Sequence, residues 1–316
     1  MFTFSTTFSA FLLFDIAVAV PTAAYYSDGD KYGPDNWYLI APKCGDVPTS
    51  KQSPIDIVTS VTAPLPYDIV KSGSCKSVTP TTDLIKDPSY RFLFPNDNTC
   101  IVNLSERNKA LYMTVQYPSE HTVNGIRYDA EMHMVHQAVD DKDAPLAGTA
   151  IRFASLTILL QEDGNLMEDD PMLAALLTDM FKDTQTSKTP KTIPEPYLLF
   201  APENAQLYTY RGSFNMEPCN EIVTWVVRTE PVKITSALLE AIKAANLKLD
   251  KAVKVAGDFQ PGANVRPIQG TNGRTVNVGT VKVGVTAAVA SGAFEQHRFS
   301  FAIFGLFLTS FLVKLL

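Results

Sequence analysis

The sequence predicts a mainly β (α+β) protein with one sheet-dominated domain over residues 25–280. Short runs of alternating apolar and polar residues predict strands, and Asn124-Gly125 between two β-prone triplets predicts a hairpin. Only two segments place apolar residues at helical spacing. The chain has 316 residues, 46% of them hydrophobic, which suffices for one large core or two small ones.

The strand patterns fall mainly in the middle of the chain. Residues 91–137 alternate in short runs, and residues 151–160 form a more apolar run that we expect to be buried on both faces. Residues 221–228 and 274–283 also have strand patterns. The Asn124-Gly125 pair suits a two-residue hairpin turn because both central residues need positive φ.

The two helical patterns cover residues 171–184 and 234–248. Pro171 stands near the first turn of the first helix, where its missing N–H costs nothing. Thr235 or Ser236 is the expected N-cap of the second helix, since a hydroxyl there can accept a free backbone N–H.

Both ends of the chain carry targeting patterns. Residues 1–24 form an apolar stretch that ends in small residues, as a secretory signal peptide does, although Asp15 and the lack of a basic start depart from that pattern. The alternative is a buried first helix. Small residues at Ser291 and Gly292, a polar spacer and an apolar tail from 299 to 316 predict a glycosylphosphatidylinositol anchor. The alternative is a transmembrane helix.

These patterns predict four parts of the chain. They are a signal peptide at 1–24, the domain at 25–280, a short stalk at 281–291 and an attachment signal at 292–316, which is removed. The expected location is therefore the cell surface, on the outer leaflet of the plasma membrane. The net charge of −6 and the absence of a basic run exclude a nucleic-acid partner.

Four cysteines in a secreted chain predict two disulfides, and three pairings are open. Asn103-Leu104-Ser105 is a glycosylation sequon, which predicts a glycan on Asn103. The alternative is a chance match that is not used.

Five segments together resemble the α-class carbonic anhydrases. They are Tyr32-Gly33-Pro34 with Trp37, CGDVPTSKQSPIDI (44–57), SEHTVNGIRYDAEMHMVH (119–136), TYRGSFNMEPCNEIVTW (209–225) and NVRPIQGTNGRTV (264–276). The resemblance implies a central, twisted, mostly antiparallel sheet of about ten strands with a few peripheral helices. It also implies a Cys44–Cys219 disulfide, which would leave Cys75 to pair with Cys100.

The resemblance further implies where a catalytic zinc would bind. Family enzymes hold zinc with three histidines, and these positions fall on Thr114, Gln116 and His133. A hydroxyl and an amide oxygen are poor zinc ligands beside imidazole. The threonine that orients the zinc-bound hydroxide in the family falls on Asn215, and the proton-shuttling histidine falls near Asn98. We therefore expect no zinc, no other cofactor and no catalytic residue.

Strand geometry supports the same conclusion without the family. The predicted domain holds three histidines, at 121, 133 and 136. In a strand over residues 131–136, His133 and His136 point to opposite faces, so they cannot share one ion. Glu120, His121, Glu131 and His136 keep the family pattern, and we expect them to be buried and to satisfy one another. Met132 and Met134 are expected in the core.

The predicted function is a catalytically inactive, carbonic-anhydrase-related binding module that recognises a glycan or an extracellular protein. The candidate cleft residues are Thr114, Gln116, Tyr117, His133, Asn215 and Asn98. The net charge disfavours a polyanionic glycan unless the fold gathers a basic patch. The alternatives are an active enzyme with a rebuilt metal site and a structural coat protein. No pattern indicates an oligomeric state.

Overall fold

The structure is a computed structural model that describes residues 34–39, 41–72, 75, 81–83, 91–140, 142, 144–146, 148, 152–181, 195–249 and 264–284. The described residues all belong to one compact unit of the chain, which lies within Met1–Val285. The predicted signal peptide, the predicted anchor sites Ser291 and Gly292, and the apolar tail lie outside the described residues. Among the described helices, none is long and apolar enough to span a membrane.

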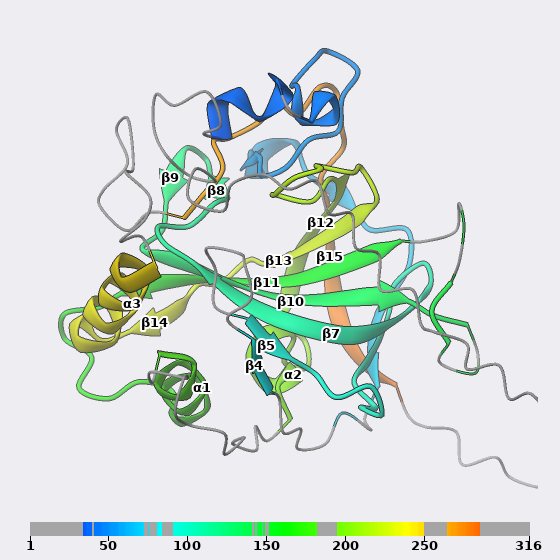
Figure 1. Ribbon diagram of the computed structural model, residues 1–316. Helices are drawn as coiled ribbons and strands as arrows, with labels where there is room; N and C mark the ends of the chain where they lie inside the picture. The colour runs from blue at the N-terminus through cyan, green and yellow to red at the C-terminus, as the bar shows by residue number, and fades with distance from the viewer. Residues whose placement is uncertain are drawn as a thin grey trace, which may run out of the picture. The chain divides into compact units, whose positions relative to one another are not determined.

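A mixed sheet of 12 strands carries the fold (Figure 1). Its strands are ordered β10 (Ala130–Ala138), β11 (Phe153–Glu162), β13 (Val223–Arg228), β12 (Gln206–Gly212), β15 (Asn277–Gly284), β3 (Ile69–Ser72), β6 (Ile101–Asn103), β7 (Arg107–Gln116), β5 (Arg91–Leu93) and β4 (Thr81–Asp83), with β14 (Val232–Ile234) on β11 and β2 (Ala63–Pro64) on β15. Strand β7 also pairs with β10, so the pairings return to the first strand of this order.

Most of these strand pairs are antiparallel, and the parallel pairs are β11–β13, β11–β14, β15–β2 and β15–β3. The predicted mainly β fold with a mostly antiparallel sheet and few helices is confirmed. One boundary differs from the prediction: β15 continues to Gly284, so the sheet includes the first residues of the segment predicted as a stalk.

A small second sheet contains the predicted hairpin. It joins β1 (Asp56–Ile57), β8 (Thr122–Val123) and β9 (Ile126–Arg127). Asn124 and Gly125 have φ values of 50° and 77°, which confirms the two-residue turn. Ile57 and Val123 pack with Trp225 in a core on one face of the large sheet.

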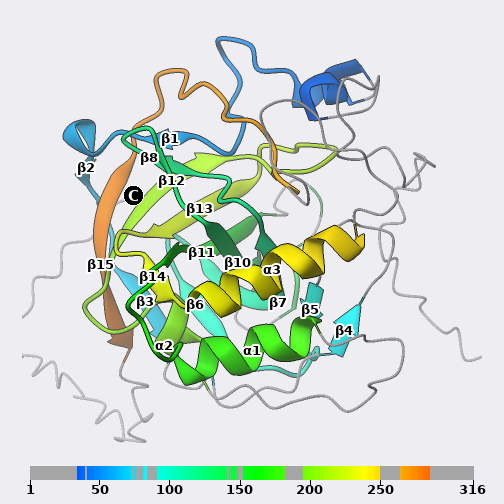
Figure 2. The same ribbon diagram turned by 90° about the vertical axis from the view of Figure 1, so that its left-hand side faces the viewer.

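The helices cover the other face. Helices α1 (Pro171–Phe181) and α3 (Ser236–Leu249) lie side by side in front of β10 and β7 in Figure 2. Their leucines share the larger core with Met132 and Met134, as expected for those methionines. The Thr235 hydroxyl accepts the Leu238 N–H at 3.1 Å and caps α3, as predicted. The shorter helices are α2 (Tyr197–Phe200), η1 (Pro34–Leu39), η2 (Pro42–Cys44) and η3 (Thr59–Val61).

Strand β12 was not predicted from the sequence. It lies between β13 and β15 in the sheet. It contains the polar residues Thr209 and Arg211, so its residue pattern does not indicate a central strand. Its last residue, Gly212, lies against the Ser53 side chain, and a Cβ at Gly212 would come within 2.1 Å of Ser53 Oγ. Only glycine fits this close approach.

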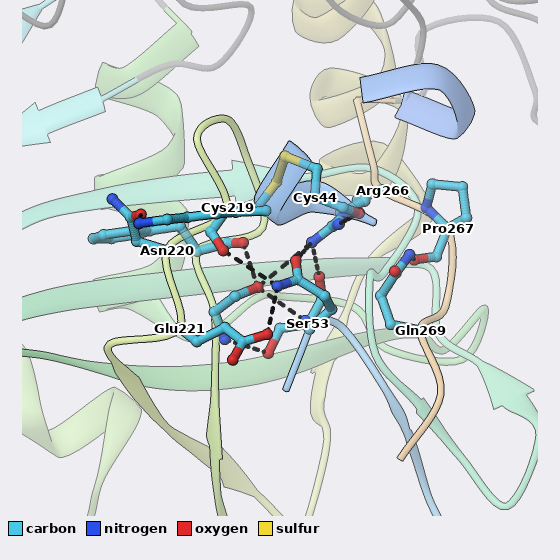
Figure 3. Close-up of a disulfide and its surroundings, with 12 residues drawn as sticks. Cys44, Ser53, Cys219, Asn220, Glu221, Arg266, Pro267 and Gln269 are labelled. Atoms are coloured by element: carbon cyan, nitrogen blue, oxygen red, sulfur yellow. Dashed lines mark hydrogen bonds between the residues drawn. A yellow bond between two sulfur atoms is a disulfide. The ribbon is translucent and has the colours of Figure 1, made fainter. Parts of the chain in front are cut away.

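Two disulfides tie distant segments together. Cys44 bonds to Cys219 and Cys75 bonds to Cys100, which confirms both expected pairs. Beside the first disulfide, the buried guanidinium of Arg266 donates to the carbonyl oxygens of Cys44 at 2.7 Å and Ser53 at 2.8 Å (Figure 3). Arg266 thereby joins segments that lie more than 200 residues apart in the sequence.

Candidate functional site

Strands β7 and β10 bring the three implied ligand positions together. His133 lies directly opposite Thr114, and the neighbouring pair is Glu131 with Gln116. Thr114 and Gln116 are two residues apart on one strand, so their side chains share the face that His133 occupies. All three residues are at most 2% exposed.

These side chains line a narrow pocket. Asn215 completes the set of predicted residues there, and the remaining lining residues are Tyr112, Val135, Ser155, Phe214, Met216, Val223 and Trp225. The cavity volume is about 10 Å³, which is close to the space of one water molecule. Within this pocket the amide oxygen Gln116 Oε1 is buried without a hydrogen-bond partner.

Two of the predicted cleft residues do not line this pocket. Tyr117 follows Gln116 by one residue, so strand alternation turns it to the other face, where it belongs to the larger core. The amide nitrogen of Asn98 donates to the carbonyl oxygens of Pro95 at 2.7 Å and Ala110 at 3.0 Å, so Asn98 braces its own loop. The prediction was wrong for Tyr117 and Asn98.

Tyr112 and Ser155 also line the pocket, and this was not predicted from the sequence. Tyr112 has the same strand parity as Thr114 and Gln116, so period two in β7 could have identified it. Ser155 comes from β11, and only the pairing of β11 with β10 places it near His133.

A buried carboxylate connects the two histidines behind this pocket. Oε1 of Glu131 lies 2.6 Å from His121 Nδ1 and 2.7 Å from His133 Nε2. Its other oxygen accepts the backbone N–H groups of Glu120 and His121, both at 2.8 Å. Burial alone would raise the pKa of Glu131, but the charge and hydrogen bond of His121 and the bond from His133 lower it well below its usual value. Glu131 is therefore ionised, and both imidazoles act as donors toward it.

The tyrosine and tryptophan of neighbouring strands fix these rings. His121 Nε2 lies 2.7 Å from the Tyr210 hydroxyl oxygen. The rings of His121 and His133 meet Trp225 edge to face, with centroid distances of 4.9 and 5.0 Å. Each of the two imidazole rings is therefore held on two sides.

A second buried carboxylate, Glu120, lies beside this network. It accepts hydrogen bonds from the Asn215 amide and from the Arg266 backbone N–H, the latter at 2.9 Å, and His133 Nε2 lies 3.9 Å away. Burial raises the pKa of Glu120 to about 7, His133 opposes this shift, and the negative charge of Glu131 adds to it. The expected mutual satisfaction therefore holds for His121 and Glu131, whereas the Glu120 carboxylate is satisfied by Asn215 and Arg266.

His136 belongs to a different environment. It lies on the opposite face of β10, where its Nε2 is 2.9 Å from the Tyr197 hydroxyl oxygen and its ring stacks on that tyrosine. Strand parity thus separates His136 from His133, as predicted. Burial lowers the pKa of His136 to about 4, so the ring is neutral near pH 7.

The residues of the pocket do not fit a catalytic zinc ion. Its donors would be one imidazole, from His133, together with the Thr114 hydroxyl and the Gln116 amide oxygen, which are weak zinc ligands. Another potential ligand group, formed by His121, Glu131 and His133, has its ligand atoms within 4.8 Å of one another. Those atoms already hydrogen bond to one another, so an ion there would have to displace both imidazole protons.

The profile of the family described as "Eukaryotic-type carbonic anhydrase" matches residues 32–280, which is most of the chain. The chain belongs to this family.

Among its relatives, this carbonic anhydrase family member is 29% identical over 266 residues to "Alpha carbonic anhydrase 8" of Arabidopsis thaliana, with 82% of this chain aligned. The alignment spans 61% of the length of that plant protein. It is 26% identical over 280 residues to "Putative carbonic anhydrase 3" of Caenorhabditis elegans, covering 79% of this chain and 95% of the worm protein.

Two solved structures share the fold. An α-carbonic anhydrase from Thermovibrio ammonificans, in complex with the inhibitor sulfanilamide, superposes with a TM-score of 0.60 at 23% identity, covering 80% of this chain and 97% of that chain. Dioscorin in complex with ascorbate also superposes with a TM-score of 0.60, at 22% identity, covering 81% and 98% of the two chains.

Proposed function

We propose that this carbonic anhydrase family member is a recognition module without zinc-dependent hydration chemistry. The observation that carries the proposal is the donor set at the implied metal position, where Thr114 and Gln116 face His133. A zinc ion activates water only when its ligands hold it firmly and leave one position open. One imidazole and two neutral oxygens do not supply such a site.

The ligand in this proposal is a glycan or an extracellular protein. Recognition of a sugar inside the pocket is not part of the proposal, because a space of about 10 Å³ holds about one water molecule. The ligand would therefore bind to an outer surface of the domain. A glycan array and a panel of extracellular proteins, probed with the full chain, test this, and the absence of any saturable binding would contradict it.

The second candidate is an active carbonic anhydrase with a rebuilt metal site. The close grouping of His121, Glu131 and His133 favours it, because their potential ligand atoms lie within 4.8 Å of one another. Elemental analysis of the purified chain, with stopped-flow measurement of CO2 hydration, separates the two candidates. We expect zinc well below one ion per chain and no hydration above the buffer rate. One bound zinc, with activity that a chelator removes, would establish the second candidate.

We propose further that the protein is displayed on the cell surface by a lipid anchor attached at Ser291 or Gly292. Phosphatidylinositol-specific phospholipase C should then release the protein from intact cells into the medium. Retention after this treatment, with extraction only by detergent, would favour a transmembrane helix instead.

A further inference from the structure

A second and larger hollow lies outside the pocket of His133. Its volume is about 430 Å³, which is within the usual range of small-molecule sites. It is lined by strand residues Thr209, Tyr210, Arg211, Thr224 and Asn277, by loop residues Asn272, Gly273, Arg274 and Thr275, and by Lys51, Leu65, Pro66 and Tyr67.

Strand register places this hollow on the opposite face of the sheet from the pocket. Thr224 lines the hollow and its neighbour Trp225 lines the pocket, and successive strand residues point to opposite faces. Arg211 pairs with Thr224, and Thr209 pairs with Asn277, so these four residues share one face. The hollow is therefore a separate site.

Three cations line this hollow, and none of its described lining residues is a carboxylate. They are Lys51, Arg211 and Arg274. Among the described residues, none of the three forms an ion pair. A chain of net charge −6 thus gathers unpaired positive charge in one concave site.

Arg274 is held in place by the backbone. Its guanidinium donates to the carbonyl oxygens of Gly270 at 2.6 Å, Thr271 at 2.8 Å and Arg211 at 3.2 Å. It also lies over the Tyr210 ring, 5.5 Å from the centroid. These partners are neutral, so they hold the Arg274 guanidinium in place without cancelling its charge. The guanidinium is therefore preorganised to bind an anion.

Two carboxylates near Arg274 accept hydrogen bonds from other, neutral donors. Asp46 and Glu221 both act electrostatically on Arg274, yet neither lines the hollow. Asp46 accepts from Ser50, the Gly270 backbone and Asn272, and Glu221 accepts from the Lys51 backbone and the Gln52 amide. Among the described residues, neither carboxylate lines the hollow or forms an ion pair with its cations, so the cations face a ligand in the hollow without a paired anion.

A polar side chain without a partner also belongs to this hollow. Thr209 is 3% exposed, and its Oγ1 is buried with no hydrogen-bond partner. A buried hydroxyl that makes no bond costs free energy, which a ligand could recover by bonding to it. Thr224, Thr275 and Tyr67 place further hydroxyl groups along the same wall.

From these features we propose that the hollow binds a sugar acid, in which Lys51, Arg211 and Arg274 hold the carboxylate and the hydroxyl-bearing wall holds the ring. The combination of cations with neutral hydrogen-bonding groups and the Tyr67 ring fits an oxyanion attached to a hydroxylated ring. The inference rests on the proposed recognition role. The two are tested separately: zinc content and CO2 hydration test the recognition role, and ligand titration tests this site.

Calorimetric titration of the full chain, disulfides intact, tests the proposal with sodium glucuronate, glucose and inorganic sulfate. We expect saturable binding of glucuronate at one site and none of glucose. Methyl glucuronide, in which the anomeric carbon is blocked, should also bind if the natural ligand is the end of a glycan chain, and should fail if it is a free sugar acid.

Charge-removing variants locate the site. Arg211→Gln and Lys51→Gln should each weaken glucuronate binding about tenfold, since each removes a charge-assisted contact. Both side chains are exposed, so the fold should tolerate the change. Lys233→Gln is the matched control, because Lys233 is an exposed cation on β14 that does not line the hollow. Thr209→Val should weaken binding severalfold by removing the free hydroxyl.

Three results would overturn the inference. One is the absence of saturable heat with glucuronate. Another is equal affinity in the Arg211→Gln, Lys51→Gln and Lys233→Gln variants, which would place binding elsewhere. The third is binding of inorganic sulfate as tight as that of glucuronate, which would show that the wall does not contact the sugar ring.

Discussion

Thr114 lies directly opposite His133 in the antiparallel pair of β7 and β10. Opposed residues on one face of such a pair have Cβ atoms about 4.5–5.5 Å apart, a separation that two imidazoles bound to one ion can span. The strand pairing that the implied metal site would need is therefore present, and Thr114 and Gln116 stand at two of its three implied ligand positions.

The first prediction is that two substitutions create a zinc site. The Thr114→His/Gln116→His variant places three imidazoles on one face, so we expect close to one zinc ion per purified chain, against much less in the parent. Elemental analysis and chelator competition measure this. The triple variant Thr114→His/Gln116→His/His133→Gln is the control and should lose the ion. Equal zinc in the double and triple variants would show that binding does not use this face.

The second prediction concerns the carboxylate of Glu131. Glu131→Gln turns one acceptor oxygen into an NH2 group that faces donors, and we expect a loss of about 3–5 kcal/mol in the free energy of unfolding. Urea unfolding followed by tryptophan fluorescence measures it. Glu240→Gln is the control, because Glu240 is 71% exposed in its pair with Lys243, and it should change stability by less than about 0.5 kcal/mol. Similar losses in both variants would contradict the structural role of the buried carboxylate.

The third prediction is a pH dependence caused by His136. Its folded pKa of about 4 lies below the unfolded value of 6.5, so the unfolded chain binds the proton first as pH falls. The stability that the neutral ring permits is fully present above pH 6.5, and it declines by about 3 kcal/mol as pH falls toward 4. His136→Gln lacks this titration and leaves Glu120 unchanged. The stability advantage of the parent over the variant should therefore shrink between pH 7 and 5 in urea unfolding. A constant difference would show that His136 is not buried as a neutral ring.

The fourth prediction compares the two disulfides. Cys44 and Cys219 are 175 residues apart, whereas Cys75 and Cys100 are 25 apart, so the first cross-link restricts the unfolded chain more. Paired Cys→Ser variants should lose about 5 kcal/mol for the first bond and about 3.5 kcal/mol for the second. Denaturant unfolding of both variants tests this order. A smaller loss in the Cys44/Cys219 variant than in the Cys75/Cys100 variant would contradict the prediction.

Local patterns predicted the elements whose residues follow a simple period. The alternation around His133, the Asn124-Gly125 turn and the Thr235 cap each depend on neighbours a few residues away, and all three are confirmed. Strand β12 was missed because Thr209 and Arg211 interrupt its apolar pattern. Thr209 and Arg211 line the hollow, so the residues that hid this strand from the sequence analysis are residues of the proposed second site.

The sequence by itself determined the family, the strand parity that separates His133 from His136, and the replacement of two implied ligands by Thr114 and Gln116. These depend on residue identity and on period two, which need no distant contacts. Only the tertiary structure decided the pocket's small volume, the removal of Tyr117 and Asn98 from it, and the gathering of Lys51, Arg211 and Arg274 around one hollow. The physical reason is that cavities and charge clusters form where segments far apart in sequence meet, and strand pairing sets those meetings.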